Sequence, residues 1–132
     1  MGYPIGTEAG RFAVGWLQKK LSRGQGVGPK DANNLVRSGA MLLDVREQTE
    51  WHAGHSPGAR HVPLGNLEGK LGALPRDRNV VVVYRSGNRS ARATSLLVRS
   101  GFEAVNLNGG MQAWAATGFP VETVGSQPGR VV

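Results

Sequence analysis

The sequence has 132 residues, of which 39% are hydrophobic, and this length and composition predict a single folded domain with one core. It contains no cysteine, which excludes disulfides, thiolate nucleophiles and cysteine metal ligands. Lys and Arg number 16 against 9 Asp and Glu, a formal net charge of +7, and this balance favours acidic partners. Because the basic residues are scattered and not interleaved with aromatic ones, nucleic acid is not expected as a partner.

The hydropathy pattern indicates no membrane segment. No run of about eighteen apolar residues occurs, and the first residues lack the basic-then-apolar layout of a secretory signal. We therefore expect a cytoplasmic chain without a transmembrane segment, present as a monomer or a weak dimer.

The two ends differ in composition from the middle. Residues 1–28 are predicted to form an extension, with an amphipathic helix at 8–22 followed by a glycine-rich linker. That helix is expected to pack on the domain or to lie at its edge; the alternative is a basic helix that binds a surface or a partner. Residues 123–132 have the composition of a flexible tail. The folded domain is therefore expected to span residues 29–122.

Within that span, short apolar runs alternate with helical patterns. The clearest strand, residues 80–84, has four consecutive valines and an aromatic residue, which is typical of a strand buried on both faces of a parallel sheet. Alternating strands and helices predict an α/β fold with a small, mostly parallel central sheet flanked by helices. Strands are expected at 41–45, 60–62, 80–84 and 104–107, and helices at 30–38, 47–53, 64–71, 90–100 and 110–117.

The junction between strand 80–84 and helix 90–100 carries the strongest functional signal. Ligands of open α/β sheets bind at the carboxyl ends of strands. Gly87 and Asn88 readily adopt positive φ, which lets backbone N–H groups converge. Arg85 and Arg89 add full charges to the positive end of the following helix. These features predict a site for one small anion, although an ordinary loop with solvated arginines would explain the glycine and asparagine alone.

Several further motifs surround this junction. They are, in chain order, Leu43-Asp44-Val45-Arg46 with Glu50, Gly54-His55, Gly58-Ala59, Gly101-Phe102, Asn108-Gly109-Gly110-Met111, Trp114 and Gly118-Phe119-Pro120-Val121. Together with the junction, they resemble the rhodanese-like domain family over residues 29–122. The resemblance implies that the active-site loop consists of Tyr84, Arg85, Ser86, Gly87, Asn88 and Arg89.

In the active members that the chain resembles, this loop opens with a cysteine and closes with an arginine. The cysteine takes sulfur from a donor such as thiosulfate, carries it as a persulfide and passes it to a thiol or cyanide, and no cofactor is needed. Converging N–H groups and a helix N-terminus lower the pKa of such a thiol. Here Tyr84 occupies the cysteine position, and a phenol oxygen cannot hold a transferable sulfur. Phosphatases of similar fold have a longer loop, so phosphatase chemistry is disfavoured by length as well.

We therefore predict a rhodanese-like domain without sulfurtransferase activity, acting as a binding or regulatory module. Its ligand would be a small oxyanion similar to thiosulfate, sulfate or phosphate, or an acidic protein surface. The alternative is a thiosulfate sulfurtransferase whose cysteine is missing only in this version of the chain.

Two other groups of polar residues are interpreted as structural. Asp44, Arg46 and Glu50 could serve as acid and base, but an ion pair between Arg46 and Glu50 that ties a loop to the core is the stronger reading. The resemblance places these three and His55 at the pocket rim in a mainly structural role. The three histidines of the chain lie close together but lack the helical spacing of zinc ligands, so no metal site is expected; they are His52, His55 and His61.

Overall fold

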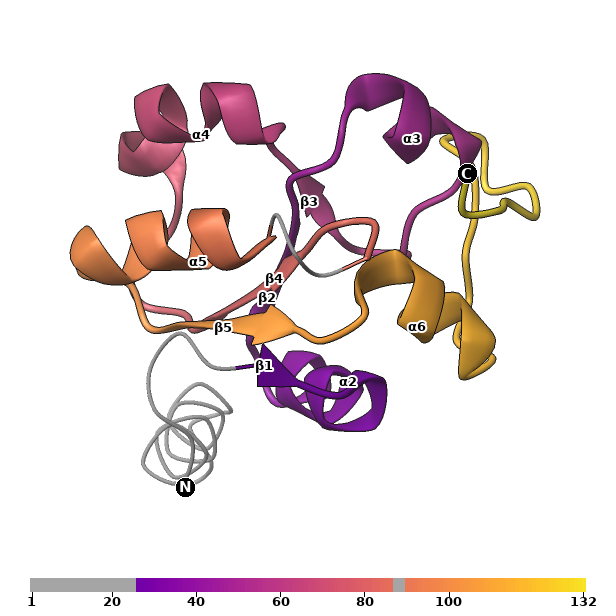
Figure 1. The fold of residues 1–132 in the computed structure, drawn as a ribbon, viewed down its shortest axis with the longest axis horizontal. Coiled ribbons are helices and arrows are strands. Elements are labelled where there is room, and N and C mark those ends of the chain that lie inside the picture. Colours follow the sequence, from indigo (N-terminus) through magenta and orange to yellow (C-terminus); the bar gives the residue numbers. More distant parts are fainter. Residues whose placement is uncertain (1–25, 87–89) are drawn as a thin grey trace, which may run out of the picture.

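The computed structural model describes residues 26–86 and 90–132, and it shows an α/β fold around one parallel sheet (Figure 1). The five strands have the order β1-β5-β4-β2-β3, and every neighbouring pair is parallel. This architecture confirms the predicted fold class. The strands are β1 (Gly26–Val27), β2 (Met41–Asp44), β3 (Arg60–His61), β4 (Val80–Val83) and β5 (Ala104–Leu107).

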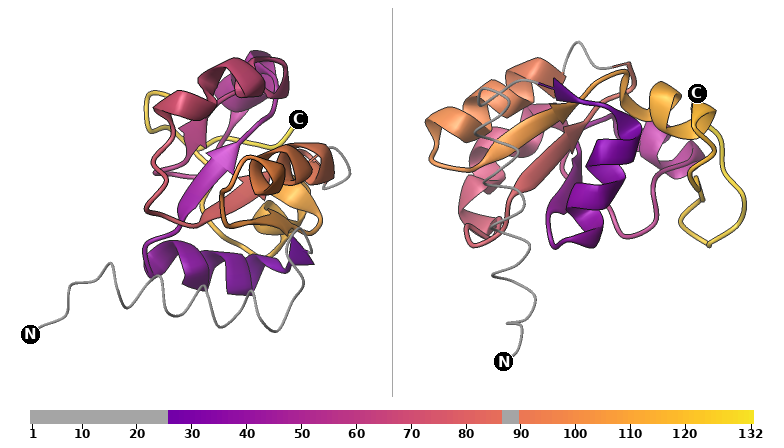
Figure 2. Two further views of the ribbon diagram at one scale, coloured as in Figure 1. Left: turned by 90° about the vertical axis from the view of Figure 1, so that its left-hand side faces the viewer. Right: turned by 90° about the horizontal axis from the view of Figure 1, so that it is seen from below.

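Helices connect the strands and cover both faces of the sheet (Figures 1 and 2). Leu67 of α4 and Leu97 of α5 belong to the buried cluster on one face, whereas Leu35 of α2 and Trp114 of α6 belong to the cluster on the other. The helical elements are α2 (Pro29–Arg37), α3 (Gln48–Ala53), α4 (Leu64–Lys70), the short 3-10 helix η2 (Leu71–Ala73), α5 (Ser90–Arg99) and α6 (Gly110–Ala116).

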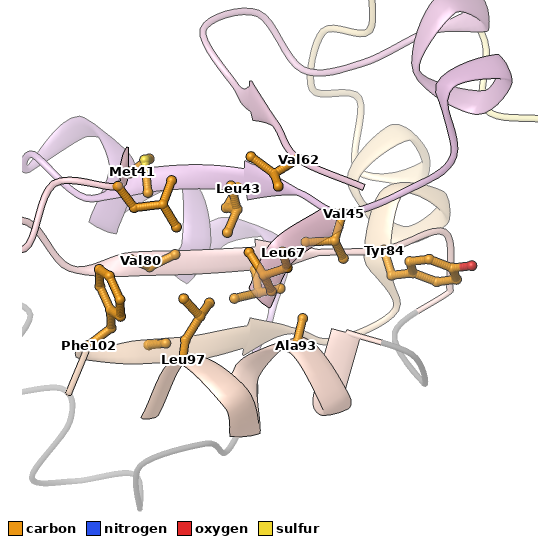
Figure 3. Packing of buried hydrophobic residues seen from close by; sticks show 13 residues of the cluster. Met41, Leu43, Val45, Val62, Leu67, Val80, Tyr84, Ala93, Leu97 and Phe102 are labelled. Carbon is orange, nitrogen blue, oxygen red and sulfur yellow. The ribbon is translucent and has the colours of Figure 1, made fainter. Parts of the chain in front are cut away.

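The central strand β4 supplies side chains to both clusters. Val80 and Val82 face the cluster under α4 and α5, which Figure 3 shows from close by, and Val81 and Val83 face the opposite cluster. This alternation follows from the pleat of a strand, in which successive side chains point to opposite faces. All four valines are at most 1% exposed, which explains why the strand has no polar positions.

The structure adds one strand that the sequence pattern did not indicate. Gly26 and Val27, which lie in the predicted glycine-rich linker, form β1 and pair with Asn106 and Leu107 of β5. Val27 is buried in the core, so the sheet begins earlier than the expected start at residue 29. The predicted helix at 8–22 lies outside the described residues.

The last residues of the chain run back along α3. The backbone of Glu122 pairs with that of His55 through two hydrogen bonds of 2.9 Å, and the N–H of Arg130 donates to the carbonyl of Ala53 at 3.0 Å. The segment predicted as a flexible tail, residues 123–132, therefore follows a hydrogen-bonded path beside the domain, while the division of the chain into domains remains a prediction. In the part of the chain that the structure describes, no helix is both long and apolar enough to span a membrane.

The beginning of α6 lies directly against the residues that follow β4. The N–H groups of Met111 and Gln112 donate to the carbonyls of Tyr84 and Arg85, at 2.8 and 3.0 Å. These bonds satisfy N–H groups that have no partner within the helix. The approach requires glycine at Gly110, because φ is +57° there and an added Cβ would overlap the Tyr84 carbonyl.

We predict that Gly110→Ala lowers the free energy of unfolding by about 2–4 kcal/mol, since the methyl group adds a backbone overlap to an unfavourable φ. Urea denaturation measures this loss. Gly58→Ala is the matched control, because Gly58 also has a positive φ (+81°) but nothing lies within 4 Å of the added Cβ. That control should lose only about 1–2 kcal/mol. Equal losses in the two variants would contradict a tight contact between α6 and the residues after β4.

Candidate functional site

The predicted loop begins with Tyr84, the first residue after β4. Its side chain is only 8% exposed and belongs to the buried cluster that includes Val45 and Ala93 (Figure 3). The ring is therefore packed within the protein and does not extend into solvent. Its carbonyl accepts a hydrogen bond from α6, so backbone and side chain are both fixed.

The next two residues, Arg85 and Ser86, are exposed. The Nε of Arg85 donates to the backbone oxygen of Val132 at 2.6 Å, a contact that no sequence pattern indicates because 47 positions separate the two residues. The remaining residues of the predicted loop, Gly87, Asn88 and Arg89, lie outside the described residues, so their cradling geometry stays a prediction. Helix α5 begins at Ser90, the predicted position.

A buried ion pair between Asp44 and Arg46 lies at the carboxyl end of the neighbouring strand β2. Arg46 is 0% and Asp44 1% exposed. The Arg46 Nη2 lies 2.8 Å from Asp44 Oδ2, and its Nε lies 2.9 and 3.1 Å from the two carboxylate oxygens. Asp44 Oδ1 also accepts from the Arg46 backbone N–H at 3.0 Å. One carboxylate therefore fixes both the bend after β2 and the arginine side chain, as a two-pronged Arg–carboxylate contact does.

The same arginine reaches α3 and β3. Its Nη2 donates to the carbonyl of Gly54 at 2.7 Å, and its own carbonyl lies 2.8 Å from Nε2 of His61. Its Nη1 has no hydrogen-bond partner among the described residues. Because they are buried, Asp44 and Arg46 are not open to a ligand from solvent, and their structural role at a pocket rim stays a prediction.

The predicted ion pair between Arg46 and Glu50 is wrong. Glu50 instead accepts from the backbone N–H of Glu47 at 2.9 Å, and the side chain of Glu47 accepts from the N–H of Glu50 in return. These carboxylates accept hydrogen bonds from free N–H groups at the start of α3, an arrangement known as a capping box. Residues 44 and 46 lie two positions apart on an extended segment, so their side chains share a face, and this spacing is the signal that could have identified the correct pair.

Two of the histidines stack on one tryptophan. The ring centroid of Trp51 lies 3.6 Å from that of His55 and 4.6 Å from that of His61, with interplanar angles of 5° and 4°. Nδ1 of His55 lies 2.8 Å from the Trp51 carbonyl, while His52 is exposed. The stack ties α3 to β3. Among the described residues, no three His, Cys, Asp or Glu side chains gather in a group that could hold a metal ion.

We predict that Asp44 and Arg46 make strongly coupled contributions to the free energy of unfolding. Asp44→Asn and Arg46→Met should each lower the free energy of unfolding by about 3–5 kcal/mol, because each leaves a buried group without its partner. The double variant should lose at least about 2 kcal/mol less than the sum of the single losses. Arg78→Met is the matched control, since Arg78 also donates to a backbone carbonyl but is exposed, and it should lose under about 1 kcal/mol. Additive losses in the cycle would contradict the coupling.

Comparisons with known proteins agree with this arrangement. The family model described as "Rhodanese-like domain" matches residues 28–117. The chain is 36% identical over 103 residues to the thiosulfate sulfurtransferase GlpE of Pseudomonas fluorescens, covering 77% of this chain and 94% of that protein. It is 41% identical over 73 residues to the putative sulfurtransferase YtwF of Bacillus subtilis, covering 55% of this chain and 71% of the relative.

Solved structures of similar fold support the same conclusion. The rhodanese-related protein of Thermoplasma volcanium superposes with a TM-score of 0.70 at 32% identity, covering 74% of this chain and 96% of that one. The family model covers well over half of the chain, and the parallel sheet, the helices and the buried residues of the Leu43–Arg46 motif are all in place. The chain belongs to the rhodanese-like domain family, and it does so without a cysteine.

Proposed function

We propose that this chain is a rhodanese-like domain that binds a small oxyanion or an acidic partner at the loop Tyr84–Arg89 and does not transfer sulfur. The observation that carries the proposal is the absence of cysteine from the whole sequence, in a chain whose relatives include proteins named as sulfurtransferases. Location in the cytoplasm and a monomeric or weakly dimeric state belong to the same proposal.

The identity and packing of Tyr84 support the loss of activity. Persulfide chemistry needs a thiolate, since that is the form of cysteine that attacks a sulfur donor. We assign Tyr84 to the nucleophile position because it is the first residue after β4 and the loop sequence continues from it to Arg89. Its buried ring occupies volume that a small thiol would leave open.

The position and charge of the loop support anion binding. It lies at the carboxyl end of the central strand β4, the edge at which open α/β sheets bind ligands. Helix α5, which is 10 residues long, begins directly after it and directs the positive end of its dipole toward it. Arg85 is exposed, and its Nε contact with Val132 involves one of the five N–H donors of a guanidinium. A sulfate-sized ion would thus meet charge and helix dipole together.

We predict that millimolar sulfate or thiosulfate shifts the backbone amide signals of residues 86–89 in ¹⁵N-labelled protein. Arg85→Ala should weaken this binding about tenfold, because a charge-assisted hydrogen bond is lost. Arg99→Ala removes a charge that is also exposed, at the far end of α5, about 14 Å along the helix, and should leave the affinity within about twofold. If the amide chemical shifts of these residues do not change on addition of either anion, the proposal of anion binding is contradicted.

We predict that the chain has no thiosulfate:cyanide sulfurtransferase activity and that Tyr84→Cys introduces it. Tyr84→Ser is the matched control, because it opens the same space without a thiol. Both variants lose core packing, by about 2–4 kcal/mol, so circular dichroism must show that they are folded. Activity in the unmodified chain would disprove the assignment. Activity in the cysteine variant alone would mean that the pocket still supports sulfur transfer, as the alternative of a sulfurtransferase with a missing cysteine also requires.

A further inference from the structure

The edge strand β3 lies at the opposite side of the sheet from β1, and helix α4 follows it in the chain (Figure 1). Residues of β3 and α4 line a groove. Its volume is about 410 Å³. Buried Val62 and Leu74 contribute apolar surface to it. β2 separates β3 from β4 in the sheet, so the groove is distinct from the loop that follows β4.

The outer edge of β3 directs backbone groups away from the sheet. The N–H of Val62 donates to the carbonyl of Asp44 at 3.0 Å. In a parallel ladder alternate residues direct their backbone groups to the same neighbour, so Arg60 and Val62 face β2 and the N–H and C=O of His61 face away from the sheet. His61 lines the groove. An extended chain that enters the groove can therefore pair with this residue as an added strand.

The rim of the groove is basic. Asn66 and Lys70 are four positions apart on α4 and so share one helix face, and both line the groove. Arg60 lines it from β3, and its Nη2 donates to the carbonyl of Ala73 at 3.3 Å. Arg60 and Lys70 are both exposed, and the described residues that line the groove include no Asp or Glu.

We propose that this groove is a docking site for an extended, acidic segment of a partner protein, which adds to the sheet beside β3. Its backbone would pair with His61, its apolar side chains would contact Val62 and Leu74, and its carboxylates would pair with Arg60 and Lys70. A second copy of this chain is a poor occupant, because pairing of two β3 edges would bring the same cations together.

The test uses the full ¹⁵N-labelled chain and a capped hexapeptide of alternating Glu and Val, with the Lys–Val peptide as the charge control. We expect the Glu–Val peptide to shift the amide signals of His61 and Val62 and the Lys–Val peptide to leave them in place. Lys70→Glu should raise the Kd of the Glu–Val peptide at least about tenfold, since an attraction becomes a repulsion. Arg37→Glu is the matched control, because Arg37 is likewise an exposed basic residue that ends a helix, on α2; its Kd should change by less than about twofold.

Three results would overturn the proposal. The first is an equal change of Kd in Lys70→Glu and Arg37→Glu, which would reduce the binding to net charge. The second is a set of shifts confined to Ser86 and its neighbours, which would place the peptide at the loop after β4. The third is self-association of Lys70→Glu in ultracentrifugation with unchanged peptide affinity. That result would mean that the basic residues beside β3 prevent the exposed strand edge from pairing with another copy of the chain.

Discussion

The carboxylate of Asp44 determines how the chain leaves the central sheet. It accepts from both the backbone N–H and the guanidinium of Arg46, and that guanidinium also bonds the carbonyl of Gly54 at the end of α3. The Arg46 carbonyl in turn lies at hydrogen-bonding distance from His61 on β3. One buried pair thus connects β2, α3 and β3. Removal of either charge would leave the other buried in a medium of low dielectric, so few other residue pairs would be tolerated at this position. The family motif around the pair is intact although the chain has no cysteine.

A second set of contacts holds the start of the loop independently of any catalytic group. The carbonyls of Tyr84 and Arg85 accept the first N–H groups of α6, and Gly110 allows the close approach. The Tyr84 ring is part of the same core as α5 (Figure 3). None of these contacts requires a cysteine, and the tyrosine adds apolar area to the core. In physical terms, the rhodanese-like fold of this chain does not depend on a cysteine after β4.

The sequence predicted the elements of the fold more completely than the contacts of the site. Strong local patterns, such as the four valines of β4 and Gly101 after α5, marked strands and helices to within about two residues. β1 was not predicted, because Gly26 and Val27 form a strand only by pairing with β5, which lies far away in the sequence. Arg46 was assigned the wrong partner, since spacing alone does not reveal that Glu50 is required by the N-terminus of α3. The contact between Arg85 and Val132 depends on tertiary structure and has no local signal.

The two surfaces at which the chain could meet a partner both carry positive charge, but the surroundings of that charge differ. At the loop after β4, charge is combined with a helix N-terminus, an arrangement that suits a compact anion. At the β3 edge, the cations lie beside an apolar floor and an outward-facing backbone, an arrangement that suits an extended acidic chain. The two ligands differ in shape, so they need not compete for one site. If both proposals hold, the domain binds a small anion and a protein segment at the same time, and the net charge of +7 favours the approach of both.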